Sequence, residues 1–273
     1  MKNLVYDIGM HKGNDTDFYL KKGFNVIAVE ANPVLVEKVL IKFKKEIKSG
    51  QLIIINKAIA PKGLKEVEFF VNDKKDDWGT ILPDWNRSMG GTYQSVIVET
   101  TTLDEIIEKF GLPYYIKIDI EGADILCLET LVRKNVIPKH LSIELLNPNN
   151  FKNKDVDALA IFSILYVIGY RRFKVSDQSK NNFLTPPFPS LEGNFVDFSF
   201  DGESSGLFGK ELDLDEFTID EVAKMYLHYF YSFNEIKKSS VTSFFSKWSK
   251  TLNLKKNENV FHKNGWFDVH VSF

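Results

Sequence analysis

Short apolar runs alternate with segments of helical periodicity along the first 176 residues of the chain. Residues 4–8, 25–29 and 52–55 are largely apolar, as in strands that are buried on both faces. Residues 14–22 and 33–50, which lie between these runs, carry apolar side chains at helical spacing. Strand, helix, strand, helix and strand within about 55 residues predict a parallel sheet with helices on its faces.

The alternation continues beyond these residues. An N-cap at Thr102 starts a predicted helix, and residues 65–71 and 93–101 have strand-like composition on either side of a polar excursion, 72–91. That excursion carries Trp78 and Trp85. Further strands are predicted at 115–119, 141–146 and 170–175, and further helices at 103–110, 123–134 and 155–168.

The pattern breaks down after residue 176. Proline and glycine clusters come first, and a capping box of Thr218 and Glu221 then predicts the start of a helix. Residues 266–273 alternate between apolar and polar positions, as in a half-buried strand. We expect them to be the last strand of the same sheet, near its edge, which leaves 177–264 as a long insertion in a single domain of 273 residues.

Composition narrows the class of protein. Hydrophobic residues make up 44% of the chain and charged residues 26%, as in an ordinary globular protein. The formal charge of −2 argues against a surface that follows nucleic acid, so no nucleic acid partner is expected. Cys127 is the single cysteine, which excludes an internal disulfide and suits a reducing compartment.

Membrane signals are weak. The chain shows neither a signal-peptide pattern nor an apolar run of the roughly 20 residues that a span needs, so we expect a cytoplasmic protein without stable membrane insertion. Residues 237–256 hold six lysines and no acidic residue, with apolar positions at helical spacing. This segment suits either weak contact with a membrane surface or lid packing with a solvated basic face. The oligomeric state stays open.

The turn after the first strand has the composition of a cofactor-binding loop. It runs from Asp7 to Gly13, and its glycines allow a tight reversal and a close approach of a ligand to the backbone. The spacing Gly-x-x-x-Gly departs from the dinucleotide fingerprint, which weakens an NAD interpretation. Glu30 ends the second strand, where a carboxylate can accept both ribose hydroxyls. A nucleoside ligand is predicted.

Asp7-x-Gly-x-x-x-Gly together with Glu30 resembles the glycine-rich and ribose-binding motifs of class I S-adenosylmethionine-dependent methyltransferases. Residues 116–124, Ile-Lys-Ile-Asp-Ile-Glu-Gly-Ala-Asp, with 102–107 and 142–144 around them, are similar to the FkbM family, in which a lysine, aspartate, glutamate and glycine recur on strand four. The resemblance covers roughly residues 4–146. It implies an α/β, Rossmann-like, seven-stranded methyltransferase sheet with a reversed last strand, and S-adenosyl-L-methionine as cofactor.

Site residues follow from the motifs and the resemblance. Asp119 and Glu121 close strand four, and alternation places both on one face with Lys117. They are expected to bind the methionine amine, to orient an acceptor hydroxyl, or to form a buried ion pair. His11 faces either the sulfonium or solvent. Asp119, His11 and Glu121 are therefore the catalytic candidates, and cofactor contacts are expected from Asp7, Gly9, Gly13, Glu30, Asn32, Asn56, Ala58 and Asp119.

A carboxylate-only metal site is an alternative role for three of the acids. Glu144, on strand five, would join Asp119 and Glu121 in it. The sequence has no histidine or cysteine spacing that supports a transition metal, so we expect no metal.

The acceptor is the least determined part. The resemblance implies an O-methyltransferase that acts on a sugar hydroxyl of a glycan or on a secondary metabolite. An N-methyltransferase for an amino sugar and a non-catalytic nucleoside-binding module are the alternatives. The 72–91 excursion and the 177–264 insertion are expected to form an acceptor-side lid, with a loop at 202–209 that is mobile before substrate binds. A surface-packed appendage or an oligomer contact is the alternative for the insertion.

Overall fold

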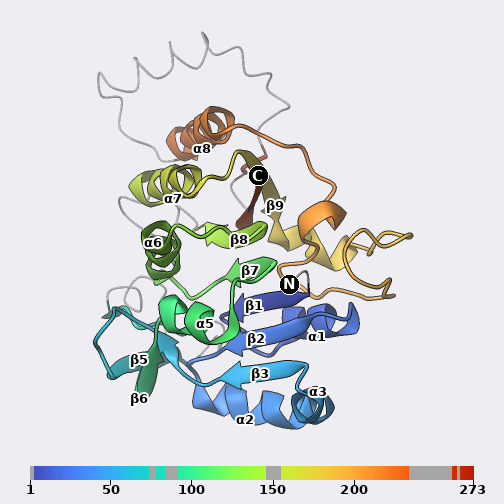
Figure 1. The fold of residues 1–273 in the computed structure, drawn as a ribbon. Coiled ribbons are helices and arrows are strands. Elements are labelled where there is room, and N and C mark those ends of the chain that lie inside the picture. Colours follow the sequence, from blue (N-terminus) through green and yellow to red (C-terminus); the bar gives the residue numbers. More distant parts are fainter. Residues whose placement is uncertain (1–2, 74–77, 84–91, 146–154, 234–259, 263–264) are drawn as a thin grey trace.

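The computed structural model describes the chain except for residues 1–2, 74–77, 84–91, 146–154, 234–259 and 263–264 (Figure 1). Its main sheet contains β1 (Leu4–Ile8), β2 (Asn25–Val29), β3 (Leu52–Ile55), β7 (Tyr115–Ile118), β8 (His140–Leu145), β9 (Arg172–Asp177) and β10 (Phe267–Ser272), in the order β3-β2-β1-β7-β8-β10-β9. The first five strands in this order pair in parallel, whereas β10 pairs antiparallel with both β8 and β9. The predicted seven-stranded sheet with a reversed last strand is confirmed.

Helices cover both faces of this sheet. They are α1 (Asn14–Lys21), α2 (Pro33–Lys42), α3 (Lys44–Ser49), α5 (Leu103–Phe110), α6 (Ile125–Lys134), α7 (Asp155–Ile168) and α8 (Ile219–Phe233). In Figure 1, α5, α6, α7 and α8 follow one another along one side, while α1 lies on the other side near β1 and β2. This arrangement follows from right-handed crossovers between parallel strands.

Local sequence signals set most of the helix ends. Thr102 accepts a hydrogen bond from the Glu105 amide at 3.2 Å, and the Glu105 carboxylate bonds back to the Thr102 amide, which completes a capping box at α5. Before α8, the Thr218 amide and the Thr218 hydroxyl both donate to the Glu221 carboxylate at 2.8 Å. The single helix predicted for 33–50 is wrong, because Phe43 leaves helical geometry and separates α2 from α3. Its ring is 3% exposed and packs under Gly13, so tertiary packing overrides the periodicity.

A second, smaller sheet follows β3. It contains β4 (Ala58–Ile59), β5 (Glu66–Asn72) and β6 (Tyr93–Thr101), in the order β4-β6-β5. β5 and β6 are the two strands predicted around the 72–91 excursion, and they pair antiparallel. Within that excursion Trp78 is described, whereas Trp85 lies outside the described residues.

The insertion packs against the sheet and α1. It begins with short 3-10 helices η2 (Gln178–Phe183) and η3 (Gly209–Glu211) and continues into α8. Lys22, which directly follows α1, lies 2.8 Å from Glu211, and both side chains are fully buried. Phe208 stacks on Tyr115 of β7 with ring centroids 4.3 Å apart. Residues 237–256, predicted to form a basic amphipathic helix, lie outside the described part of the chain.

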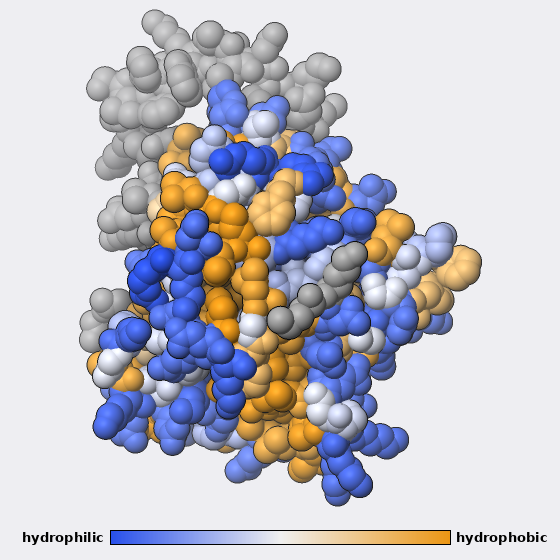
Figure 2. Space-filling model, viewed as in Figure 1, coloured by the Kyte–Doolittle hydropathy of each residue, from blue (hydrophilic) through white to orange (hydrophobic). Residues whose placement is uncertain are grey.

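The two faces of the sheet differ in polarity. Alternate residues of β7, β8, β9 and β10 point into an apolar core with α6, α7 and α8, and the residues between them form a polar face under the insertion. The prediction that β10 is half-buried is wrong, because Asp268 and His270 are only 2% and 5% exposed. Residues 178–212 cover the face on which both lie. On the outer surface, Figure 2 shows a central band of hydrophobic residues flanked by hydrophilic ones.

None of the helices in the described part of the chain combines the length and apolar character that a membrane crossing requires.

Candidate active site

A cavity of about 930 Å³, open solvent included, lies at the carboxyl ends of β1, β2 and β7. This is the edge at which open α/β sheets bind their ligands. One part of its wall is apolar, and the other part carries charged side chains from the glycine turn, from the end of β7 and from the insertion. The apolar part includes Leu35, Ile59, Phe69 and Ile81, and the charged part includes Lys12, Asp15, Asp119, Glu121 and Glu203.

Gly9 is required where the turn meets β7. Its φ is +89°, in the region that favours glycine, and an added Cβ would lie 1.8 Å from the Asp119 carbonyl oxygen. The turn can therefore cross the end of β7 only without a side chain at this position. The Lys117 ammonium donates a hydrogen bond to the Gly9 carbonyl at 3.1 Å, which holds the turn against β7.

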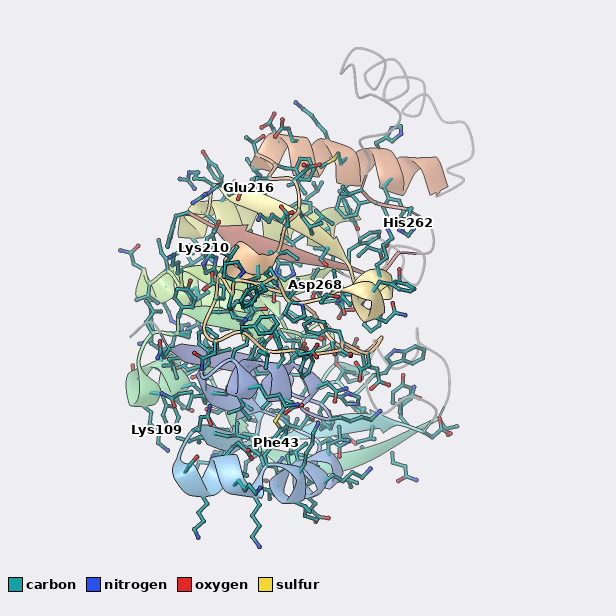
Figure 3. All side chains as sticks on the ribbon, turned by 90° about the vertical axis from the view of Figure 1, so that its right-hand side faces the viewer. Phe43, Lys109, Lys210, Glu216, His262 and Asp268 are labelled. Carbon is teal, nitrogen blue, oxygen red and sulfur yellow. The ribbon has the colours of Figure 1, made fainter. Side chains whose placement is uncertain are left out.

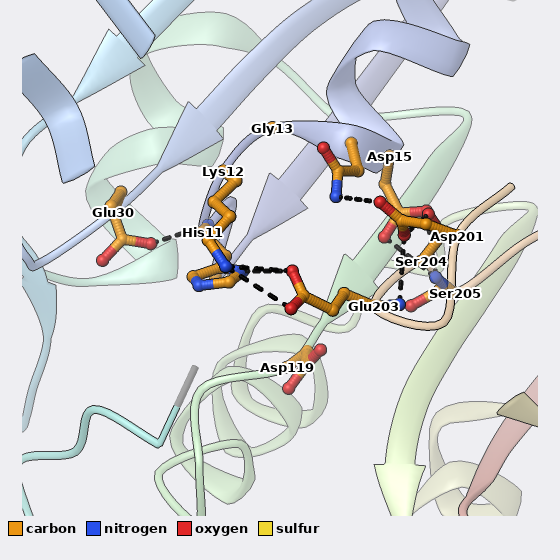
Figure 4. Close-up of polar contacts among 12 residues, drawn as sticks. His11, Lys12, Gly13, Asp15, Glu30, Asp119, Asp201, Glu203, Ser204 and Ser205 are labelled. Atoms are coloured by element: carbon orange, nitrogen blue, oxygen red, sulfur yellow. Dashed lines mark hydrogen bonds and ion pairs between the residues drawn. The ribbon is translucent and has the colours of Figure 1, made fainter. Parts of the chain in front are cut away.

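Glu30 organises the turn from the end of β2. One carboxylate oxygen accepts a hydrogen bond from the His11 amide at 2.8 Å (Figure 4), and the other accepts one from the Asn32 amide at 2.8 Å. The side chain lies in the cavity wall although the residue is only 7% exposed. Burial raises the pKa of Glu30, and the two amides oppose that rise. Each oxygen keeps a lone pair for a ligand hydroxyl.

The residues expected to bind the cofactor divide into two groups. Gly9, Glu30, Ala58 and Asp119 line the cavity, as does His11. Four others lie outside its wall and hold the backbone around it. Asp7 is fully buried and accepts a hydrogen bond from the Thr16 hydroxyl, and Gly13 is the N-cap of α1. Asn32 caps α2, and the Asn56 side chain donates hydrogen bonds to the Glu30 and Ala31 carbonyls.

Lys117 forms ion pairs with three carboxylates near the glycine turn. Its Nζ lies 3.2 Å from Asp119, 3.6 Å from Asp7 and 3.6 Å from Asp15, and its side chain is 6% exposed. Burial alone would lower the pKa of Lys117, but these three carboxylates hold it well above its usual value. The ammonium therefore stays charged and ties together β1, α1 and the end of β7.

The turn after β7 explains the spacing of the motif at 116–124. The Asp124 carboxylate accepts the Ile120 amide at 3.0 Å and the Gly122 amide at 2.9 Å. Glu121 has a φ of +51°, which turns the chain back toward the sheet. The strand itself ends at Ile118, so alternation along it does not place Glu121; the turn does.

This turn brings three carboxylates together. One oxygen each from Asp119, Glu121 and Glu144 can be chosen so that all three lie within 4.8 Å of one another. Burial raises the pKa of Glu144 well above its usual value, and the charges of Asp119 and Glu121 raise it further. Glu144 Oε1 accepts the indole N–H of Trp266, while its Oε2 has no hydrogen-bond partner among the described residues.

The 202–209 loop reaches the glycine turn. Lys12 lies 3.2 Å from Glu203, and His11 Nδ1 lies 3.9 Å from the same carboxylate (Figure 4). The Ser205 amide donates to both oxygens of Asp15 at 3.0 Å. These contacts place the loop beside the cavity, near the end of β7.

A methyltransferase model matches much of the chain. The model described as "Methyltransferase FkbM domain" matches residues 7–172, which is more than half of the sequence. The chain belongs to the FkbM methyltransferase family. It is an S-adenosylmethionine-dependent methyltransferase, and the predicted family, activity and cofactor are confirmed.

Solved methyltransferases are similar at low identity. Precorrin-6y C5,15-methyltransferase from Geobacter metallireducens is 13% identical, with a TM-score of 0.37 over 65% of this chain and 69% of that one. An rRNA methylase from Streptococcus thermophilus is 13% identical, with a TM-score of 0.33 over 70% of this chain and 82% of that one. Phosphoethanolamine N-methyltransferase 2 from Haemonchus contortus is 10% identical, with a TM-score of 0.37 over 100% of this chain and 49% of that one. No curated protein matches. The family assignment rests on the sequence model.

The cavity of this FkbM methyltransferase suits the shape and polarity of its cofactor. A flat apolar base fits the apolar part of the wall, a ribose fits beside the buried carboxylate of Glu30, and an amino acid head fits the charged part. The absence of an acidic residue after β3 agrees with an adenine slot built mainly from apolar side chains.

Several wall residues, Asp15 among them, were not predicted from the sequence, and two of these come from the last third of the chain. Trp266 directly precedes β10, and Glu203 belongs to the glycine and serine cluster of the insertion. The cluster was noticeable as a loop, but only the packing of Leu207 and Phe208 into the core brings Glu203 to the cavity. For Trp266 the sole signal was an aromatic residue before the last strand.

Proposed function

We propose that this FkbM methyltransferase transfers a methyl group to a hydroxyl oxygen of a sugar, in a glycan or in a glycosylated secondary metabolite. The observation that carries the proposal is the grouping of Asp119, Glu121 and Glu144 beside Trp266, next to the glycine turn. Carboxylates accept hydrogen bonds from several hydroxyls at once, and an indole offers a flat apolar face to a sugar ring.

Binding of the cofactor is assigned to the turn and the strand ends. Glu30 would accept the ribose hydroxyls, and Leu35, Ile59, Phe69 and Ile81 would enclose the base. Asp15 would face the charged amino acid end. When bound, S-adenosylmethionine supplies an electrophilic methyl group. The role of the protein is to align the acceptor oxygen with that methyl group and to accept the proton that the oxygen loses.

Asp119 is the proposed proton acceptor. Its side chain is 24% exposed, so an acceptor hydroxyl can reach it, and it forms an ion pair with Lys117 at 3.2 Å. Burial and the charges of Asp119 and Glu121 raise the pKa of Glu144, and in its protonated form this carboxyl would donate a hydrogen bond to an acceptor oxygen. His11 stands in the wall near Glu203 and is the second candidate for the base.

Methylation of an amino sugar is the second candidate function. The grouped carboxylates of Asp119, Glu121 and Glu144 favour it, because a ring amine that is protonated in solution is attracted to an acidic site. An amine must lose its proton before it can attack, and Asp119 could receive that proton as well.

The insertion is proposed to close the acceptor side. Glu203 is the part of the 202–209 loop that lines the cavity, and it is exposed. By contrast, residues 204–208 are buried, with Asp201 and Asp15 bonded to Ser204 and Ser205. Motion on substrate binding is therefore proposed for residues 201–203 only. A test of this closure should leave residues 204–208 unchanged, because replacing them would remove buried side chains and destabilise the fold.

The function is tested by turnover followed by product analysis. The enzyme, S-adenosylmethionine and a panel of sugars, glycans and amino sugars are incubated, and products that gain one methyl group are identified by mass spectrometry. NMR then assigns the methyl group to oxygen or nitrogen. An O-methyl product is expected; an N-methyl product would favour the second candidate, and release of S-adenosylhomocysteine with neither product would reject both.

Two variants test the role of Asp119. Asp119→Asn keeps the side-chain size and removes the base, so kcat should fall about 100-fold or more while affinity for S-adenosylhomocysteine changes much less. Asp213→Asn, at an exposed position, is the matched control and should retain activity. A loss of cofactor affinity alone in Asp119→Asn would assign Asp119 to the methionine end instead.

A further inference from the structure

A second cavity lies at the opposite edge of the sheet from the active site. It encloses about 770 Å³, open solvent included, around the start of β8, the start of β9 and the end of β10. Four basic side chains line it, against one acidic side chain, Glu216. The basic residues are Lys139, Arg172, Lys174 and Lys210. Lys210 belongs to η3, and both Lys210 and Glu216 are labelled in Figure 3.

Strand register explains this concentration of charge. On the polar face of the sheet, His270 of β10 is paired with Ser142 of β8 and with Lys174 of β9. The next row toward this edge joins His140, Ser272 and Arg172. In the other direction, the row of Glu144 and Asp268 leads to the active site. One polar face therefore ends in acids at the active site and in bases at the second cavity.

The acidic groups nearby neutralise only part of this charge. Glu216 lies 3.7 Å from Lys174 and 3.8 Å from Arg172, so it is shared between two cations. Lys174 also donates to the Leu212 carbonyl at 2.6 Å, and Arg172 donates to the Phe273 carbonyl. Lys139 lies over the Tyr114 ring, 5.3 Å from its centroid. Among the described residues, neither Lys139 nor Lys210 has a carboxylate within 4.0 Å of its ammonium group.

Two buried histidines also line this cavity. His140 and His270 both line the cavity and are only 8% and 5% exposed. Within the described chain, the Nε2 atom of each is buried without a hydrogen-bond partner, although His140 Nε2 lies 3.8 Å from Glu192. An unsatisfied buried nitrogen is destabilising and is rarely kept without compensation.

The charges around the histidines keep them neutral. Burial, together with the charges of Lys139, Lys174, Lys210 and Arg172, lowers the pKa of His140 to about 4. Burial and Lys174 likewise lower the pKa of His270, to about 3. The basic side chains around the cavity thus add to the effect of burial on the two histidines, and a bound anion would oppose their contribution.

We propose that this second cavity binds a phosphate group, either as inorganic phosphate or on a small phosphorylated molecule. Lys139 and Lys210 would supply the charge, Lys174 would contribute a partly buried ammonium, and His140 and His270 would lie beneath the bound group. A phosphate has enough acceptor oxygens to use several such donors together. His140 and Glu144 are four residues apart on β8, or about 13 Å, so this ligand would be distinct from the methyl acceptor.

The binding test uses inorganic phosphate and two double variants. Isothermal titration calorimetry is carried out at pH 7.5, with ionic strength held constant by sodium chloride. Lys139→Gln/Lys210→Gln removes two charges from the cavity, whereas Lys38→Gln/Lys48→Gln removes two exposed lysines from α2 and α3. We expect saturable binding by the unaltered protein, weakened at least about tenfold in the first variant and unchanged in the second.

Two measurements separate this proposal from loss of folding and from the proposed function. Both variants should keep the thermal unfolding midpoint in the absence of phosphate and should keep their affinity for S-adenosylhomocysteine. Ring signals of His140 and His270 in NMR spectra should shift on phosphate addition. Absence of saturable binding up to 20-fold above a physiological level of about 1 mM, or equal weakening in both variants, would overturn the proposal.

Discussion

The close crossing of Gly9 and Asp119 makes the sharpest prediction about the active site. In Gly9→Ala, the new Cβ would lie 1.8 Å from the Asp119 carbonyl oxygen, whereas real Cβ atoms stay at least 3.0 Å away. One backbone segment must therefore move by more than about 1 Å. Asp119 is the residue that we propose to accept the proton, so the substitution perturbs the reacting centre without touching its carboxylate.

Two effects contribute to the loss of stability in Gly9→Ala. A non-glycine residue at a φ of +89° costs about 1–2 kcal/mol, and forcing an extra carbon into a packed place costs about 1–3 kcal/mol more. We expect Gly9→Ala to lower the free energy of unfolding by about 2–5 kcal/mol. A misplacement of about 1 Å at the reacting centre should also reduce turnover about 100-fold.

Gly63 is the matched control. Its φ is +97°, and an added Cβ would meet no atom within 4 Å. Gly63→Ala should therefore show the conformational cost of about 1–2 kcal/mol alone and leave turnover unchanged. Urea unfolding followed by circular dichroism gives the free energies, and calorimetry with S-adenosylhomocysteine gives the cofactor affinity. Equal destabilisation in the two variants, with normal turnover in Gly9→Ala, would refute the tight crossing.

Three further predictions concern charge. Glu30→Ala should weaken S-adenosylhomocysteine binding at least about tenfold in calorimetry, because it removes an acceptor and releases the turn; exposed Glu37→Ala is the control, and equal affinities would place Glu30 outside the cofactor site. Burial raises the pKa of Asp268 to about 8 from 3.8, so between these values the folded protein holds more protons and loses stability as pH rises. Asp268→Asn should flatten urea-unfolding stability between pH 5 and 8, and parallel profiles would contradict this assignment. EDTA should leave turnover unchanged, because Lys117 already places a cation 3.2 Å from Asp119; activity lost to EDTA and restored by a divalent ion would make the acid cluster a metal site.

The sequence predicts the parallel part of the fold well because its strands are buried on both faces. The bounds of β1, β2, β3 and α7 agree with the predicted ones, since short apolar runs and glycine or proline at their ends define them. β4, with two residues, is too short for any periodicity to reveal. Phe43 interrupts a helix for a tertiary reason, its contact beneath Gly13, which no local pattern records.

The site was predictable where a motif fixes the backbone and less so where packing places side chains. The glycine turn and the strand ends in the sequence indicated Gly9, Glu30 and Asp119 as site residues, and all three line the cavity. Asn32 and Asn56 have the right location in the sequence, but their side chains bind backbone groups of the turn region instead. Alternation in β10 indicated one buried face, and the insertion then buried the other.

Lys117 links the cofactor turn to the insertion through a single set of contacts. Its ammonium holds Asp119 at the end of β7 and Asp15 at the start of α1, and Asp15 in turn receives the Ser205 amide from the insertion. A change in charge or position at Asp119 is therefore felt by Asp15, and through it by the loop that carries Glu203. Because all of these contacts are largely buried, their Coulomb energies are weakly screened by salt. The carboxylate proposed to take the proton and the loop proposed to close over the acceptor thus depend on the same cation.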